Sequence, residues 1–239
     1  MKKSTFILGG TSGLGQEIAR IVAGEGDGYE VTVAGRSAKD CELVRMGRAT
    51  PMQLDLEARH VRPTIPDDIG PFDLIVWAAG MQQRGAFSDL LTDEIRRHCR
   101  VQFEAPVEIL AELLRAQKRA DYPMHLVMIS STTSWHARAD ETLYGALKAA
   151  QSHLARGLGL ALPAELPGSK VLLVNPGGMA TPFWKHPDQD LSRFMDPASV
   201  ASIVWDEIRE QQGSFKAIQI LRQPDGTPKL ERGPRLPTF

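Results

Sequence analysis

The stretch FILGGTSGLGQEIA, residues 6–19, passes from an apolar run through a glycine cluster into a helix-like pattern. Its glycines are Gly9, Gly10, Gly13 and Gly15. The dinucleotide pattern G-x-G-x-x-G does not fit, because Ile18 stands where its last glycine belongs. The phosphate-loop pattern of NTPases does not fit either, because Gln16 and Glu17 replace its Lys and Ser/Thr. A strand, a turn and a helix start still offer free backbone N–H groups to an anion such as a pyrophosphate, so a nucleotide site and a plain turn both stay open.

The bulk composition is typical of one α/β domain. The 239 residues are 42% hydrophobic and 24% charged, which suits a single domain over residues 1–239. The net charge of -1 gives no electrostatic footprint for nucleic acid or an anionic membrane. Cys41 and Cys99 are far apart and form no C-x-x-C pair, so neither a disulfide framework nor a zinc site is indicated. No apolar run approaches a membrane span. We expect a cytoplasmic protein without metal, nucleic-acid or membrane partners.

Short apolar or β-branched runs alternate with amphipathic stretches along the chain. The expected strands are 4–8, 30–34, 51–54, 73–78, 125–130, 170–174 and 217–221. The expected helices are 13–25, about 92–119, about 143–162 and 197–211. Most strands are apolar on both faces, as in sheets that helices cover on each side. The alternation predicts an α/β fold of the Rossmann type, a doubly wound sandwich with a seven-stranded, mostly parallel sheet in the order 3-2-1-4-5-6-7 and helices on both faces.

Two segments depart from this alternation. Pro63, Pro66 and Pro71 fall between the third and fourth strands and break helices, so residues 57–71 are expected to be loop. The tail, about 222–239, is rich in Pro and Gly. We expect it to be irregular and to lie on the surface or against another subunit.

The strongest chemical signal is YGALK, in which Tyr144 and Lys148 stand four residues apart in an expected helix and share one face. An ammonium beside a phenol lowers the phenol pKa, so that the tyrosine can exchange a proton with a carbonyl or alcohol oxygen. Ser130 and Ser131 emerge at the C-terminus of the fifth strand, at the edge where open α/β sheets bind ligands, and Ser131 could hydrogen-bond the same oxygen. The alternatives are a chance pairing on one helix and a serine that only starts a turn.

These motifs, in this order, resemble the short-chain dehydrogenase/reductase family over almost the whole chain. The glycine cluster is similar to the family's T-G-x-x-x-G-x-G, with Leu8 at the usual threonine. LDL at 54–56 is similar to the element that places an aspartate beside the adenine, and WAAG at 77–80 stands where the family has N-N-A-G. NPGGMATP at 175–182 is similar to the motif that holds the nicotinamide end, and YGALK makes the Y-x-x-x-K.

The resemblance implies a role for each catalytic residue. Tyr144 would be the general acid in reduction and the base in oxidation. Lys148 would lower the pKa of the tyrosine and bind the nicotinamide ribose, and Ser131 would orient the substrate oxygen. Gln102 stands at the fourth catalytic position, where the family has an asparagine that holds a water in a proton relay. We expect that relay to be altered or slower in this chain.

The resemblance also implies a cofactor site and a substrate pocket. The expected cofactor-binding residues are Gly9, Thr11, Ser12, Gly13, Leu14, Gly15, Arg36, Ser37, Asp55, Leu56, Ala78, Ala79, Gly80, Tyr144, Lys148, Pro176, Gly177, Met179 and Thr181. The substrate pocket would contain Ser131, Tyr144, Phe183 and Trp184, beneath a lid at about 179–196. His186, Asp188 and Asp190 in that lid are expected to be a polar loop rather than a metal site.

Arg36, at the tip of the second strand, favours NADP(H) over NAD(H). An acidic residue there would accept hydrogen bonds from the adenosine ribose and repel a 2′-phosphate, and the sequence VAGRS has none. The guanidinium can pair with a phosphate, helped by Ser37 and by Thr11 or Ser12. The alternative is that Arg36 is a solvated loop residue.

The sequence therefore predicts an NADP(H)-dependent oxidoreductase acting on a ketone or secondary alcohol. We expect a homodimer or homotetramer, formed through the helices that carry Gln102 and Tyr144. One alternative is a cofactor-binding sensor or scaffold with little turnover, since Ala78 and Ala79 replace the N-N-A-G asparagine. Another is an epimerase or dehydratase of the longer branch of the family, whose G-x-x-G-x-x-G fails here at Gln16.

Overall fold

A single eight-stranded sheet forms the centre of the protein. The structure is a computed structural model that describes residues 2–25, 28–58, 65–66, 68–184 and 190–233. The strand order is β3-β2-β1-β4-β5-β6-β7-β8, and every neighbouring pair is parallel except β7 with β8. The strands are β1 (Lys3–Leu8), β2 (Tyr29–Gly35), β3 (Thr50–Gln53), β4 (Leu74–Trp77), β5 (His125–Ile129), β6 (Lys170–Pro176), β7 (Phe215–Arg222) and β8 (Pro228–Arg232). The doubly wound α/β fold and its seven expected strands are confirmed.

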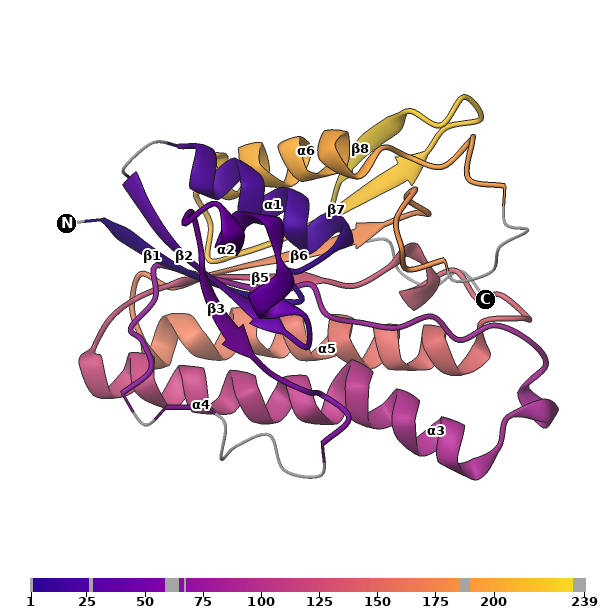
Figure 1. Cartoon of the computed structure of the whole chain (residues 1–239), viewed down its shortest axis with the longest axis horizontal. Coiled ribbons are helices and arrows are strands. Elements are labelled where there is room, and N and C mark those ends of the chain that lie inside the picture. The colour runs from indigo at the N-terminus through magenta and orange to yellow at the C-terminus, as the bar shows by residue number, and fades with distance from the viewer. Residues whose placement is uncertain (1, 26–27, 59–64, 67, 185–189, 234–239) are drawn as a thin grey trace.

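Helices cover both faces of the sheet (Figure 1). On one face lie α1 (Gly13–Gly24), the short α2 (Glu42–Arg45) and α6 (Pro197–Glu210). On the other lie α3 (Thr92–Cys99), α4 (Ala105–Ala120) and α5 (Thr142–Glu165). Short 3-10 turns span Ala38–Asp40, Phe87–Asp89 and Thr132–Ser134. The helix expected at about 92–119 is interrupted by a π turn at Arg100–Glu104, which widens the helix around Gln102.

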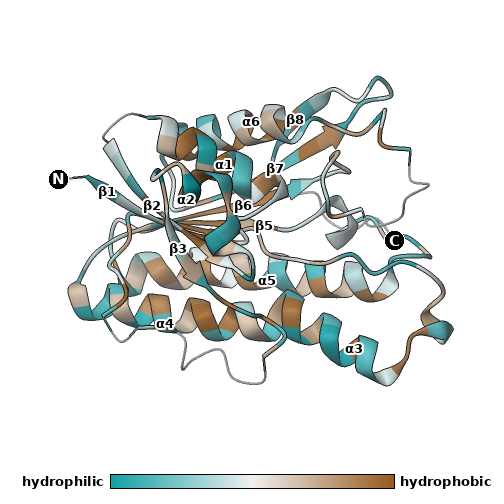
Figure 2. Cartoon of the chain, viewed as in Figure 1, coloured by the Kyte–Doolittle hydropathy of each residue, from teal (hydrophilic) through white to brown (hydrophobic). Residues whose placement is uncertain are grey.

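The core consists of two apolar layers, one on each face of the sheet. Successive strand residues point to opposite faces, so Phe6 packs in the layer with α4 and α5, and Ile7 packs in the layer with α1 and α6. All four residues of β4 are buried. Figure 2 shows the corresponding hydrophobic strands between helices that carry both hydrophilic and hydrophobic residues. The double-sided burial explains why these strands are apolar throughout rather than alternating.

The strand order reverses between β1 and β4, because the chain proceeds from β1 outward through β2 and β3 and then returns to pair β4 with β1. The loops after β1 and β4 therefore diverge at the carboxyl edge of the sheet. Such a point leaves a crevice, and ligands of open α/β sheets bind there.

The expectation of an irregular tail at about 222–239 is wrong for residues 228–232, which form β8. A turn at Asp225-Gly226 returns the chain, with Gly226 at a φ of 85° and the Asp225 carboxylate accepting from the Thr227 N–H at 3.0 Å. Such an Asp-Gly pair is a hairpin signal. The eighth strand is then held by Arg232, whose guanidinium donates to the buried Glu207 carboxylate of α6 at 2.6 Å.

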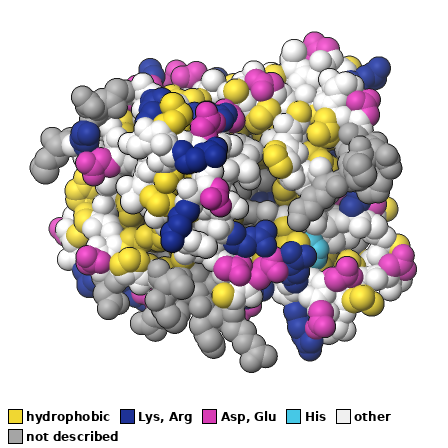
Figure 3. Space-filling view, viewed as in Figure 1, with side chains coloured by type: hydrophobic (Ala, Val, Ile, Leu, Met, Phe, Trp, Pro, Cys, Tyr) yellow, Lys and Arg dark blue, Asp and Glu magenta, His cyan; other side chains and the backbone are white. Residues whose placement is uncertain are grey.

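The described residues show no helix long and apolar enough to cross a bilayer. Among these same residues, no group of three or more His, Cys, Asp or Glu side chains is placed to hold a metal ion. His186 and Asp188 lie outside the described residues, as does much of the loop expected at 57–71. On the face viewed in Figure 3, Lys and Arg side chains are mixed with Asp and Glu.

Candidate active site

The turn between β1 and α1 packs directly on the residues that follow β4. Gly9 has a φ of 85°, and a Cβ there would lie 2.6 Å from the Ala79 backbone nitrogen. A Cβ on Gly15 would lie 2.3 Å from the Gly9 carbonyl oxygen. Real side chains do not approach that closely, so both positions need glycine. The close packing brings the start of α1 against the crevice between β1 and β4.

The first turn of α1 leaves its backbone donors available. Ser12 is the N-cap but accepts no hydrogen bond with its side chain, and the first turn holds no acidic residue. Within the described residues, the N–H groups of Gly13, Leu14 and Gly15 have no acceptor, and all three residues line the adjacent cavity. Unsatisfied N–H groups together with the helix dipole favour an anion at this place. This geometry fits the pyrophosphate of a dinucleotide.

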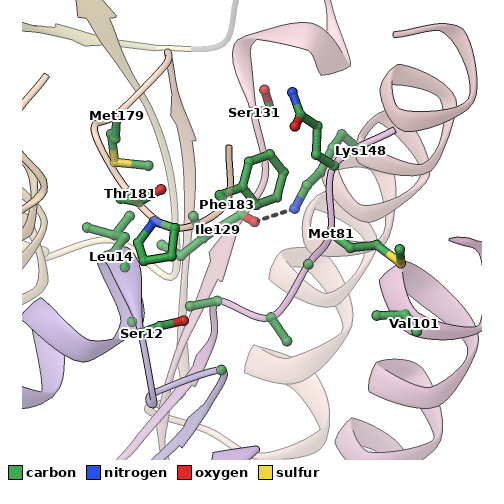
Figure 4. A pocket seen from close by; sticks show the side chains of 18 of the residues that line it. Ser12, Leu14, Met81, Val101, Ile129, Ser131, Lys148, Met179, Thr181 and Phe183 are labelled. Carbon is green, nitrogen blue, oxygen red and sulfur yellow. Dashed lines mark hydrogen bonds between the residues drawn. The ribbon is translucent and has the colours of Figure 1, made fainter. Parts of the chain in front are cut away.

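The cavity beside this turn has a volume of about 320 Å³ and extends along the carboxyl edge of the sheet. It is lined by these expected site residues: Gly9, Thr11, Ser12, Gly13, Leu14, Gly15, Arg36, Asp55, Leu56, Ala78, Ala79, Gly80, Ser131, Tyr144, Lys148, Pro176, Gly177, Met179, Thr181, Phe183 and Trp184. Figure 4 shows Lys148 and Ser131 approaching from one side and Leu14, Met179 and Thr181 from the other. Segments far apart in the sequence therefore share one cavity.

Ser37 and Gln102 do not line the cavity, and their contacts with a cofactor or substrate stay predictions. Gln102 is only 2% exposed, and its Oε1 has no partner in the described part of the chain. A Cβ built on Gly80 would lie 3.9 Å from this oxygen and 3.6 Å from Lys148 Nζ. Gln102 thus lies behind Gly80, close to the lysine. A buried acceptor without a donor is costly, so this is a suitable place for a bridging water.

Tyr144 and Lys148 are both buried on α5. Lys148 Nζ donates to the Ile129 carbonyl at 3.0 Å and to Gln151 Oε1 at 2.9 Å, and lies 5.8 Å from the Tyr144 ring centroid. Burial lowers the pKa of Lys148 to about 7. An ammonium has three N–H donors, so one remains for a further acceptor.

Burial also determines whether the Tyr144 phenol is protonated. It raises the pKa of Tyr144 above the ordinary value, and the charge of Glu141 adds to this, while a hydrogen bond with Ser131 acts in the opposite direction. The expected lowering of the tyrosine pKa by Lys148 is therefore not met in the protein alone. The phenol is held protonated because a buried phenolate would lose its hydration.

Ser131 belongs to a buried polar chain that the sequence did not predict. Its Oγ accepts from the Thr133 N–H at 3.2 Å and lies 3.1 Å from Thr133 Oγ1. Thr133 Oγ1 in turn donates to Glu141 Oε2 at 3.1 Å. Glu141 is 4% exposed, and Arg138 lies 3.6 Å from its other oxygen. These hydrogen bonds orient the Ser131 hydroxyl beside Tyr144 and connect it, through Thr133, to the Glu141 carboxylate.

Gln83 positions the start of the helix that carries Tyr144. Its Oε1 accepts from the backbone N–H groups of Leu143 and Tyr144, each at 3.2 Å. The N-cap residue Glu141 gives no such side-chain bond. A side chain from a distant loop therefore caps α5, and no sequence signal near the helix indicates it.

Arg36 lines the end of the cavity away from Tyr144 and is paired with an acidic residue. Its guanidinium donates to Glu57 Oε1 at 2.8 Å, and Arg97 donates to the same carboxylate at 2.7 and 2.9 Å. Glu57 also lines the cavity. It follows LDL by one residue and donates its N–H to the Asp55 carboxylate at 3.0 Å. Arg36 and Glu57 thus line this end of the cavity, and Arg97, which does not line it, binds the same carboxylate.

The described parts of the expected lid at about 179–196 are bound to each other. Met179 and Met195 form a parallel bridge, and the Ala180 N–H donates to the Met195 carbonyl at 2.9 Å. Trp184 Nε1 donates to the Met179 carbonyl at 2.8 Å. The Phe183 ring lies 5.8 Å from the Tyr144 ring, centroid to centroid. The Phe183 ring thus packs beside the phenol and the Trp184 ring packs against Phe183, while their contact with a substrate stays a prediction.

Comparisons with known proteins agree with this geometry. The short chain dehydrogenase family matches residues 3–192. The chain is 26% identical over 210 residues to the cyclic-di-GMP-binding biofilm dispersal mediator protein of Escherichia coli strain K12, covering 84% of this chain and 87% of that protein. It is 26% identical over 205 residues to the D-erythrulose reductase of Gallus gallus, covering 84% and 79%.

A solved short-chain dehydrogenase from Sphingobium yanoikuyae in complex with NADPH has the same fold, with a TM-score of 0.77, 19% identity, and 89% of this chain and 87% of that chain covered. The family match spans most of the chain and includes the glycine turn, Ser131, Tyr144 and Lys148. The chain therefore belongs to the short-chain dehydrogenase family, whose members are NAD(P)-dependent oxidoreductases acting on CH–OH groups.

Proposed function

We propose that this protein transfers a hydride between NADP(H) and a ketone or secondary alcohol, with Tyr144 as the general acid in reduction and the base in oxidation. The observation that carries the proposal is the placement of Tyr144, Lys148 and Ser131 together in one cavity, beside a helix N-terminus with free N–H groups. A proton donor, a cation and an anion-binding turn are the groups that this reaction needs from a protein.

The residues act on the proton and on the substrate oxygen. The bound nicotinamide supplies the hydride in reduction and accepts it in oxidation. Tyr144, held protonated by burial, donates its proton to the developing alkoxide. Ser131 hydrogen-bonds the same oxygen and stabilises its charge. Lys148 offers its remaining N–H to the cofactor ribose or the phenol oxygen, and its charge stabilises the phenolate that remains.

NADP(H) is proposed over NAD(H) because of the charges at the far end of the cavity. β2 ends at Gly35 and Arg36 follows it, so the strand tip has no carboxylate to receive a ribose 2′-hydroxyl. Arg36 would bind a 2′-phosphate, and Arg97 adds a second cation nearby. Glu57 opposes them, so binding of the phosphate requires Arg36 to leave or share this carboxylate.

The test is turnover of NADPH with a panel of ketones, followed by its absorbance, in the wild type and in Tyr144→Phe. Removal of the phenol should lower kcat roughly 100- to 10,000-fold, since that is the usual contribution of a general acid. The variant should bind NADPH as tightly as the wild type. Equal turnover by both proteins would overturn the role of Tyr144.

A second candidate is a nucleotide-binding protein with little turnover. It is favoured by one similar protein, which is named for binding cyclic-di-GMP, and by the glutamine at position 102. Tight NADPH binding without oxidation by any ketone would support this candidate. An epimerase or dehydratase has no specific observation in its favour.

We also propose that the protein works as a homodimer or homotetramer in the cytoplasm. Leu160 on α5 is 82% exposed, although it is a large apolar side chain. An exposed leucine on a helix beside a small residue, Ala161, suits packing against a second copy.

A further inference from the structure

A second cavity, of about 500 Å³, adjoins the active cleft and is rich in arginine. Arg138, Glu141 and Trp184 line both cavities, so the two are continuous at these side chains. The second cavity also takes in Arg193 and Arg222, together with Arg84. None of these three arginines lines the first cavity.

A row of aromatic rings connects this second cavity to the catalytic phenol. The rings of Tyr144 and Phe183 lie 5.8 Å apart, those of Phe183 and Trp184 5.8 Å, and those of Trp184 and Phe194 4.9 Å. Arg222 ends the row, with its guanidinium carbon 4.6 Å from the Phe194 ring centroid. Stacking on a ring restricts an arginine and leaves its N–H edges free to bind an anion. The row therefore forms an apolar wall that leads from the reacting oxygen to a cation.

The arginines differ in how far their charges are already neutralised. Arg84 donates to the Asp140 carboxylate at 2.6 Å, and Arg138 lies 3.6 Å from Glu141. The Ser192 hydrogen bond and the charge of Arg193 lower the pKa of the Asp190 carboxyl, so the Arg193 charge is partly compensated. Arg222, by contrast, makes no ion pair with any residue in the described ranges.

Acidic groups in the same cavity weaken but do not cancel this positive charge. Glu141 is already bonded to Thr133 and lies near Arg138. Asp190 lines the cavity, and its carboxylate accepts from the Ser192 N–H at 2.9 Å. No carboxylate of the described residues pairs with Arg222, the arginine at the end of the aromatic row.

We propose that this second cavity binds an anionic group of the substrate, a carboxylate or a phosphate, while the substrate carbonyl lies at Tyr144. The inference rests on the proposed reduction and names its substrate class: ketones that carry an acidic group several bonds away from the carbonyl. Arg222 is the main partner of the anion and Arg193 is the second. An arginine fork binds carboxylate and phosphate oxygens through paired N–H donors, and the aromatic row accommodates the chain between the two ends of the substrate.

The test compares charged ketones with matched neutral ones. For the carboxylate arm the substrates are 6-oxoheptanoate and its methyl ester, and for the phosphate arm 6-oxoheptyl phosphate and 7-hydroxyheptan-2-one. In the wild type, kcat/KM should be roughly tenfold or more higher for the charged member of at least one pair, as for a bond to a charged partner. The effect should lie mainly in KM, because the anion contacts are the same before and during the reaction.

Variants test whether the preference for charged ketones depends on the arginines of the second cavity. Arg222→Ala should reduce it to within about twofold, and Arg193→Ala should reduce it partly, with turnover of the neutral substrate unchanged in both. Arg96→Ala is the matched control, since Arg96 is an exposed arginine on α3 that pairs with Asp93 and does not line either cavity. The control should keep the wild-type preference.

A binding measurement separates this inference from the proposed reaction. Addition of 6-oxoheptanoate or 6-oxoheptyl phosphate should change the tryptophan fluorescence of the wild type, and Trp184→Phe should abolish the change. Binding of the charged compounds without turnover of any ketone would contradict the proposed reductase activity and support the proposed anion site in the second cavity. Equal kcat/KM for the charged and neutral members of both pairs would contradict the anion site and leave the proposed reductase activity standing. Absence of both binding and turnover would overturn both.

Discussion

Lys148 Nζ lies 5.8 Å from the centroid of the Tyr144 ring, and both side chains are buried on the same face of α5. Burial disfavours the charged form of each group, so it acts on them in opposite directions. The lysine pKa falls to about 7 and the tyrosine pKa rises. The phenol therefore keeps its proton, as a general acid must, while the ammonium is close to losing one.

Lys148→Met should make the protein more stable near neutral pH while it abolishes activity. The folded-state pKa of Lys148, about 7, lies below the unfolded value of about 10.4, so the folded protein binds fewer protons between them. The free energy of unfolding of the wild type therefore rises with pH between these two pKa values. The destabilisation caused by burying the Lys148 ammonium is greatest at pH values below the folded-state pKa. A difference of one between the folded-state and unfolded-state pKa corresponds to about 1.4 kcal/mol of stability.

The measurement is thermal unfolding of both proteins across the same pH window. The difference in Tm should be largest at its acidic end and should shrink toward its alkaline end. Lys118→Met is the control, because Lys118 is an exposed lysine paired with Glu165. A Tm difference that does not depend on pH would contradict the lowered lysine pKa.

Glu141→Gln should move the alkaline limb of the reductase pH profile to lower pH. The charge of Glu141 helps to raise the pKa of Tyr144, so its removal lets the phenol lose its proton earlier. Reduction needs the protonated phenol, and kcat/KM should fall from a lower pH upward. Full pH profiles of the two proteins test this, with Glu165→Gln at the exposed end of α5 as control. An unchanged limb would show that Glu141 does not act on Tyr144.

Glu57→Gln should strengthen NADPH binding, and Arg36→Asp should weaken it. The Glu57 carboxylate occupies Arg36 and Arg97, and the neutral amide would release them for a 2′-phosphate. We expect about a threefold to tenfold decrease in the Kd for NADPH, reduced at high salt because the site is exposed. Fluorescence titration with NADPH and NADH measures both affinities. If Glu57→Gln improves NADH binding equally, the effect is not on the phosphate.

Gly15→Ala and Gly157→Ala should have opposite effects. A Cβ on Gly15 meets the Gly9 carbonyl at 2.3 Å, so the turn must shift, and we expect lower stability and at least about tenfold weaker cofactor binding. A Cβ on exposed Gly157 meets nothing within 4 Å, and alanine in a helix should add about 0.5–1 kcal/mol of stability. Thermal unfolding and NADPH titration compare the two. Unchanged NADPH binding by Gly15→Ala would contradict the proposal that the turn between β1 and α1 contacts the cofactor.

Leu160→Asp should dissociate the proposed oligomer. A charge placed on an apolar contact between two copies would be buried without a partner, which is strongly unfavourable. Analytical ultracentrifugation of the wild type should show a dimer or tetramer, and the variant should sediment as a smaller species. Met46→Asp places the same charge on another exposed apolar residue, distant from α5 in the sequence, and should leave the mass unchanged. A monomeric wild type would reject the oligomer outright.

The sequence alone determined the order of strands and helices and most of the cavity wall. Burial on both faces makes each central strand an apolar run, and each helix between them has an amphipathic pattern. Both patterns can be recognised within a short stretch of sequence. The residues Gly9, Ser131, Tyr144 and Lys148 stand at strand ends or on one helix face, and the topology of a parallel sheet then brings them together. The eighth strand was also readable, since Asp225-Gly226 is a local turn signal that the proline content concealed.

Only the tertiary structure decided the electrostatics of the site. The bond from Arg36 to Glu57, the bonds from Gln83 to the start of α5, and the cavity that holds Arg193 and Arg222 join residues whose spacing follows no periodic pattern. The protonation of Tyr144 and Lys148 depends on how much water is excluded around them, which the packing of α5 against the sheet and the lid sets. Burial is a property of the assembled fold, and so the pKa values could not be predicted from the four-residue spacing.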